Sequence, residues 1–152
     1  MPSILPLVKT LSKDFPSVNF APGDRFLWSP SEVTVFYEES SKPEAPALLL
    51  HELGHALLNH TSYQRDIELL AMETSAWEKA TELATQYSVA VSENDTEDHL
   101  DTYREWLHAR SSCPNCTANG FQTARTTYSC PACAHTWRVN EARLCALRRY
   151  SA

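Results

Sequence analysis

The feature that most constrains this chain is an apolar stretch that carries two histidines and a glutamate. Its sequence is Leu48-Leu-Leu-His-Glu-Leu-Gly-His-Ala-Leu-Leu58, which predicts a helix that packs in a core. Residues four apart on a helix lie on one face, so His51 and His55 can bind one metal ion. Glu52, beside them, can then polarise a water on that ion. A catalytic zinc normally has three protein ligands and keeps its fourth position for water, so one ligand is missing from this stretch.

A glutamate in the next expected helix is the candidate for that third ligand. Asp66 is expected to cap a long helix over residues 67–91, in which apolar residues recur every three or four positions. Glu73 falls in the middle of this apolar stripe. Because a carboxylate that faces a core is costly unless it is paired or bound to a cation, we predict Glu73 as the ligand. A buried salt bridge is the alternative role, and Asp66 and Glu68 are the alternative ligands.

Short elements are expected around these two helices. They comprise helices at residues 3–14 and 96–110 and strands at residues 18–20, 25–28 and 32–38. Ser41–Glu44 resembles a capping box that leads into the histidine helix. That helix is expected to end near Asn59, which would leave His60 exposed to solvent at its end.

Two CxxC pairs, thirteen residues apart, mark the last part of the chain; the four cysteines are Cys113, Cys116, Cys130 and Cys133. Four thiolates in two close pairs predict a tetrahedral structural zinc site with no open position. Disulfides or a redox pair are the alternatives, and His135 is a substitute ligand. The strand-like residues 121–128 and 135–139 complete a zinc ribbon, which is followed by a short C-terminal helix with Cys145. A module of this size builds little core and needs its metal to fold.

The charge changes sign along the chain. Residues 1–110 hold 8 Lys and Arg against 18 Asp and Glu, whereas residues 111–152 hold 5 Arg against one Glu. We therefore predict two domains, 1–110 and 111–152. The basic module has the charge to bind nucleic acid, an acidic protein or the acidic N-terminal domain. The first residues resemble neither a signal peptide nor a membrane span, and paired cysteines favour metal in a cytosolic chain, so we expect a cytoplasmic protein.

The segment His51-Glu-Leu-Gly-His55, followed by Glu73-Thr-Ser-Ala76, resembles the pattern of the gluzincin metallopeptidases. That pattern is HExxH and then ExxA or ExxD on a following helix. The small ImmA/IrrE-type proteins and the minimal gluzincins are nearest in size, and the resemblance covers about residues 25–90. A short β-sheet before the histidine helix is also as expected for this family.

The resemblance implies a role for each matching residue. His51, His55 and Glu73 would bind zinc, and Glu52 would be the general base. A peptide substrate would lie along an edge strand above the helix, at about Val33–Glu38. The family usually adds a histidine or tyrosine that stabilises the oxyanion; the candidates are Tyr63, Tyr87, Tyr103, His99 and His108.

Two other protease patterns match less of the sequence. The metzincin pattern needs glycine at position 58 and histidine at position 61, where this chain has Leu58 and Thr61. The SprT-like proteases also combine HExxH with a C-terminal zinc ribbon, but they take a third histidine shortly downstream. After His60 this chain has no histidine before His99.

The sequence thus predicts an α+β fold, in which a zincin-like domain precedes a zinc ribbon, and two bound Zn²⁺ ions, one catalytic and one structural. The function expected is that of a zinc-dependent endopeptidase with a peptide or protein substrate. It would be latent if the C-terminal module covered its cleft. The alternative is a nucleic-acid-associated regulatory protein, or a SprT-like DNA-linked protease, that uses the ribbon for binding.

Overall fold

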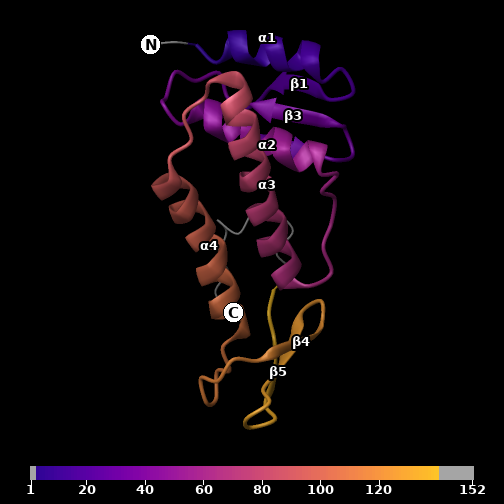
Figure 1. Ribbon diagram of the computed structural model, residues 1–152. Coiled ribbons are helices and arrows are strands. Elements are labelled where there is room, and N and C mark those ends of the chain that lie inside the picture. Colours follow the sequence, from indigo (N-terminus) through magenta and orange to yellow (C-terminus); the bar gives the residue numbers. More distant parts are fainter. Residues whose placement is uncertain (1–2, 141–152) are drawn as a thin grey trace. The chain divides into compact units, whose positions relative to one another are not determined.

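The computed structural model describes residues 3–140, which form four helices and two three-stranded sheets (Figure 1). In chain order the elements are α1 (Leu5–Asp14), β1 (Asn19–Pro22), β2 (Leu27–Ser29), β3 (Thr34–Tyr37), α2 (Ala45–Leu57), α3 (Asp66–Tyr87), α4 (Glu93–Ser111), β4 (Phe121–Ala124), β5 (Thr127–Ser129) and β6 (Thr136–Arg138). The mixed α+β class is confirmed. Within this part of the chain, no helix combines the length and the apolar character needed to cross a membrane. The expected C-terminal helix, with Cys145, Arg143, Arg148 and Arg149, lies outside the described residues.

The chain packs as two compact units. The first comprises the described residues up to Thr61 together with Met72–Glu93, and the second comprises Ser62–Ala71 together with the described residues from Asn94 onward. Each unit takes part of α3. The domain boundary after residue 110, drawn from charge, stays a prediction, while packing groups nearly all of α4 with the cysteine module.

The sheet of the first unit has the order β1-β3-β2, with β1 parallel and β2 antiparallel to β3. β3 is the most buried strand, since Val35 and Tyr37 are both buried. In Figure 1 the sheet lies between α1 and α2, and α2 packs against β2 and β3. The prediction that Val33–Glu38 is an edge strand is wrong, because both sides of β3 are paired. The two edges of this sheet are β1 and β2.

The α2 helix is apolar around most of its circumference and is buried accordingly. Nine of its thirteen residues are buried, among them Leu49, Leu50 and Leu53. The helix begins with Pro46 in its first turn, where the missing N–H has no partner to lose. Glu44 precedes the helix without a side-chain cap bond, so the expected capping box is not formed.

A glycine lets α2 and α3 approach closely within the first unit. A Cβ atom at Gly54 would lie 2.7 Å from the backbone oxygen of Ala76, nearer than real Cβ contacts allow. Gly54 lies between His51 and His55 on α2, and Ala76 lies three residues after Glu73 on α3. The absent side chain therefore brings the two histidines within reach of the glutamate.

The second unit holds a small core and a buried polar network. Leu69, Tyr103 and Trp106 form the core, with Tyr63, Leu70 and Leu107 packed against it. The cysteine module contributes the antiparallel sheet β4-β5-β6. Three of its side chains, Gln122, Tyr128 and Trp137, form hydrogen bonds with residues of the helices.

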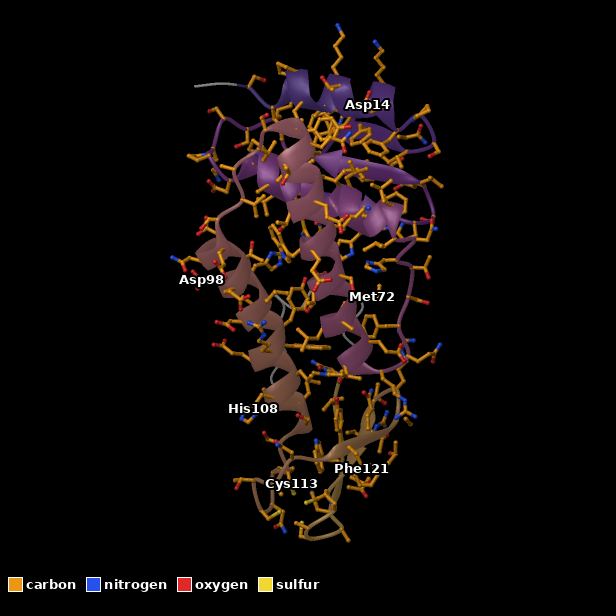
Figure 2. All side chains as sticks on the ribbon, in the orientation of Figure 1. Asp14, Met72, Asp98, His108, Cys113 and Phe121 are labelled. Atoms are coloured by element: carbon orange, nitrogen blue, oxygen red, sulfur yellow. The ribbon has the colours of Figure 1, made fainter. Side chains whose placement is uncertain are left out.

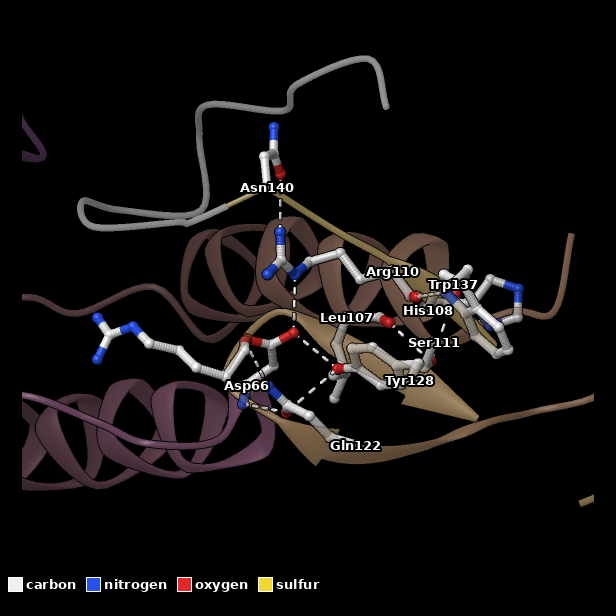
Figure 3. A network of polar contacts seen from close by, with 10 residues as sticks. Asp66, Leu107, His108, Arg110, Ser111, Gln122, Tyr128, Trp137 and Asn140 are labelled. Atoms are coloured by element: carbon white, nitrogen blue, oxygen red, sulfur yellow. Dashed lines mark hydrogen bonds and ion pairs between the residues drawn. The ribbon is translucent and has the colours of Figure 1, made fainter. Parts of the chain in front are cut away.

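Asp66, at the start of α3, is the centre of this network (Figure 3). Its Oδ2 accepts hydrogen bonds from Arg110 Nε at 2.7 Å and from the Tyr128 hydroxyl at 2.6 Å. Its backbone N–H donates to Gln122 Oε1 at 2.8 Å, and Trp137 Nε1 donates to the backbone oxygen of Arg110 at 2.9 Å. Burial and the bond to Asp66 raise the pKa of Tyr128. The buried ion pair thus joins α3 to α4, and the hydrogen bonds of Gln122, Tyr128 and Trp137 fix the cysteine module to it.

Candidate functional site

The structure brings His51, His55 and Glu73 together in the first unit. Their ligand atoms all lie within 4.8 Å of one another, and all three side chains are buried. Glu73 Oε2 lies 2.8 Å from His51 Nε2, and Glu73 Oε1 lies 3.3 Å from His55 Nε2. Met72, labelled in Figure 2, marks this part of α3. Helix periodicity explains the arrangement, because the two histidines share one face of α2 while Glu73 lies on the buried face of α3.

The charges of this cluster are coupled. Burial by itself would raise the pKa of Glu73, but the hydrogen bonds and charges of His51 and His55 outweigh it, so this pKa lies well below its usual range. Burial opposes protonation of His55, yet its contacts with Glu73 raise the pKa of His55. Glu73 is therefore a carboxylate at neutral pH. Two imidazole nitrogens and one carboxylate oxygen are a donor set that fits zinc and leaves one of four positions open.

Glu52 is held beside the cluster by β2. The backbone N–H of Trp28 donates to Glu52 Oε2 at 2.8 Å, and Glu52 Oε1 lies 3.6 Å from His51 Nδ1. Trp28 also donates from its indole Nε1 to the backbone oxygen of His60 at 2.8 Å. One strand residue therefore fixes both the predicted base and the end of α2. No local signal in the sequence around Trp28 indicates this role, since it depends on how the sheet packs against α2.

Trp77 lies one turn after Glu73 on α3 and stacks on His51. The ring centroids are 4.3 Å apart and the planes are inclined by 6°. The sequence places Trp77 on the apolar stripe of α3, and it is buried, but the pattern does not indicate the ring on which it stacks. The contact shields one face of the His51 imidazole and restricts its rotation.

His60 differs from its predicted position. It is half-buried, and its Nδ1 lies 2.8 Å from His55 Nδ1. Asn59 adopts a left-handed backbone conformation, with φ at 54°, which folds the chain back over the last turn of α2 instead of letting it run into solvent. The expectation that His60 is exposed is therefore wrong.

The other predicted residues have different surroundings. Asp66 is bound by Arg110 and Tyr128, and Glu68 accepts a hydrogen bond from the backbone of Gln64, so neither joins the cluster.

Tyr87, one of the candidates for an oxyanion-stabilising residue, donates to Asp14 Oδ2 at 2.7 Å. Partial burial and this bond raise the pKa of Tyr87 to about 12. The remaining candidates for an oxyanion-stabilising residue belong to the second unit: Tyr63, His99, Tyr103 and His108. The structure singles out none of the five for that role.

The four predicted cysteines of the ribbon gather into a second cluster; they are Cys113, Cys116, Cys130 and Cys133. Their sulfur atoms all lie within 4.8 Å of one another, and none of the four forms a disulfide. Cys113, labelled in Figure 2, lies two residues after the end of α4. His135 is exposed and is not part of this cluster. Four thiol groups at these distances fit a tetrahedral zinc ion with no open position.

The backbone of the two cysteine pairs repeats the same geometry. The N–H of Asn115 points at Cys113 Sγ, and the N–H of Ala132 points at Cys130 Sγ, each at 3.4 Å. Asn115 also donates from its side chain to Cys133. This bond, with one from the backbone of His135, lowers the pKa of Cys133 to about 6. Donors aimed at sulfur favour thiolates, which are the form that binds metal.

Comparisons of the chain with protein-family profiles, with curated proteins and with solved structures found no match. What is shown is therefore two candidate metal sites that fit zinc: one of two histidines and a glutamate, and one of four cysteines. The resemblance to gluzincins rests on the residues themselves.

Proposed function

We propose that this protein is a zinc-dependent peptidase of the gluzincin type, with a zincin-like fold built around α2 and α3. The observation that carries the proposal is that Glu73, eighteen residues after His55, is buried with its carboxylate against the Nε2 atoms of both histidines. If Glu73 served only in a structural ion pair, one histidine would be enough to pair with its carboxylate. Three buried donors around one point, with a glutamate beside them, match the ligand and base arrangement of a catalytic zinc site.

The residues of the chain divide the chemistry between them. His51, His55 and Glu73 would hold the ion, which when bound supplies Lewis acidity toward a water and a scissile carbonyl. Glu52 accepts a proton from the attacking water and delivers it to the leaving amine. The N–H of Trp28 holds Glu52 Oε2 at 2.8 Å, which keeps this carboxylate oriented while it exchanges the proton.

The substrate would bind along β2 rather than β3, because β3 is paired on both sides. Peptide binding at a sheet edge uses main-chain hydrogen bonds that an edge strand leaves open. The Trp28 N–H points from β2 toward Glu52, so the outer side of β2 faces the proposed base. Because Glu52 already accepts the Trp28 N–H, a peptide at this edge would pair with the other main-chain groups of β2 and run past Glu52.

The first experiment replaces the proposed base. Glu52→Gln should retain zinc and lose peptide hydrolysis, because the amide keeps the shape but does not accept the proton. Glu78→Gln, at an exposed position of α3, is the matched control and should keep full activity. Turnover by Glu52→Gln at the wild-type rate would refute the assigned base.

The second experiment counts metal ions. The full chain should bind two Zn²⁺ per molecule; Glu73→Ala should lose the ion in the first unit and Cys113→Ser the ion in the second. Independent losses would establish two separate sites. Retention of both ions by Glu73→Ala would contradict the ligand assignment.

Nucleic-acid binding and latency stay predictions. Of the five arginines after residue 110, the structure describes Arg125 and Arg138, both exposed. Binding of DNA or RNA that weakens with added salt would support a role for the ribbon, and absence of binding at low salt would exclude it. Cleaving the chain after residue 110 is a poor test of latency, because Arg110 would lose Trp137 and Asp66 would lose Tyr128.

A further inference from the structure

We infer that His60 is a positioning residue that holds His55 in the orientation required for metal binding. The inference rests on the metal site of the proposed function but not on peptide hydrolysis. It starts from the contact between His55 Nδ1 and His60 Nδ1, which are 2.8 Å apart. That distance is short for a hydrogen bond between two nitrogens, so one ring donates to the other.

The direction of this hydrogen bond follows from the metal site. His55 Nε2 faces Glu73 at 3.3 Å, so Nε2 is the atom that would bind the ion and must then carry no proton. The one proton of a neutral imidazole is then on Nδ1 of His55, which donates to Nδ1 of His60. His60 accepts, and carries its own proton on Nε2. Metal-binding histidines are commonly fixed in this way through their second ring nitrogen.

The end of α2 delivers His60 to this place. The N–H of His60 donates to the backbone oxygen of His55 at 3.0 Å, and the N–H of Asn59 donates to that of Ala56 at 3.1 Å. With the left-handed Asn59, these are the two bonds of a Schellman motif. In such a motif, the residue after the left-handed position commonly contacts the side chain five residues earlier. Here that contact joins two imidazoles.

Two neighbours hold His60 in place and separate it from the ligand positions. Its backbone oxygen accepts a hydrogen bond from Trp28 Nε1 at 2.8 Å, which ties it to β2. Its side chain approaches His55 at Nδ1, the nitrogen that does not face Glu73, and His60 is not part of the three-residue cluster. His60 therefore acts on the metal through His55.

Matched substitutions test the inference through zinc affinity in the full chain. His60→Leu removes the acceptor, whereas His60→Asn places an oxygen near the position of Nδ1. His60→Leu should weaken zinc binding in the first unit by about 10–100-fold, the usual effect of losing such a partner, and His60→Asn should recover most of that loss. His135→Leu, at an exposed histidine of the ribbon, should leave this affinity unchanged.

Nuclear magnetic resonance of the wild-type, zinc-loaded chain supplies a readout that needs no substitution. The Nδ1 proton of His55 should exchange slowly with water and show a coupling across the hydrogen bond to Nδ1 of His60. A rapidly exchanging proton without this coupling would overturn the inference, whether or not the variants fold.

The outcomes separate this inference from the proposed function. Zinc bound by His60→Leu with wild-type affinity overturns the role of His60 alone. A wild-type chain that binds zinc only at the cysteines overturns the proposed function as well. Cobalt substitution distinguishes the sites, because thiolate ligands give intense charge-transfer absorption that histidine and carboxylate ligands lack.

Discussion

Replacing Gly54 by alanine tests the close approach of α2 and α3 on which the histidine–glutamate site depends. The added Cβ would lie 2.7 Å from the backbone oxygen of Ala76, whereas ordinary contacts begin at 3.4 Å. The two backbones must therefore separate by about 0.7 Å, the difference between these distances. Glu73 is three residues from Ala76 on the same helix, so it moves with the displaced backbone.

The expected magnitudes follow from this displacement. Forcing an extra carbon into a packed core costs about 1–3 kcal/mol, and alanine favours a helix interior over glycine by about 0.5–1 kcal/mol. The free energy of unfolding should therefore fall by about 1 kcal/mol. The effect on the metal is larger, because metal–ligand distances tolerate only about 0.2 Å. Zinc affinity in the first unit should drop about tenfold or more.

A competition titration with a chromophoric chelator measures the affinity, and denaturant unfolding measures the stability. Gln86→Ala, at an exposed position of α3, is the control and should change neither quantity appreciably. The reasoning is refuted if Gly54→Ala binds zinc as tightly as the wild type and is at least as stable. That result would mean that the helices are not in close contact at this point.

Two further predictions concern stability. Arg110→Ala leaves the buried carboxylate of Asp66 without its cation and should lower the free energy of unfolding by about 3–5 kcal/mol. Tyr128→Phe removes one hydrogen bond and should lower it by about 1 kcal/mol. Equal losses of the two variants in denaturant unfolding would contradict the assigned ion pair. Val33 has φ at 50° although it is β-branched and exposed, so Val33→Gly should raise the free energy of unfolding by about 1 kcal/mol. Glu32→Gly, at the preceding exposed position, should lower it slightly, and a decrease for Val33→Gly as well would show that no strain is relieved.

Local patterns in the sequence predicted the helices and the candidate metal ligands. Apolar residues at helical spacing predicted α3 to within four residues at its end. The same spacing placed Glu73 on the buried face, and Glu73 is indeed buried beside the two histidines. These predictions succeed because helix periodicity is a property of the backbone, so it carries over from sequence to structure without knowledge of the fold.

Two features were predicted wrongly, one because it depends on pairing between distant strands and the other because it depends on the backbone conformation of a single residue. Val33–Glu38 has the pattern of a strand, but the pattern does not tell a central strand from an edge strand. His60 was assigned to solvent because the helix was expected to end there, whereas the left-handed Asn59 turns the chain back. A left-handed conformation at a residue other than glycine gives no strong signal in a single sequence.

The sequence by itself determined the chemistry available to this protein: two histidines one helical turn apart with a glutamate between them, and four cysteines in two close pairs. These follow from residue type and spacing along one element. Only the tertiary structure decided that Glu73 comes to lie beside both histidines and that β2 holds Glu52. The physical reason is that these contacts join residues whose distance in space is set by packing, at Gly54 above all, and not by their separation along the chain.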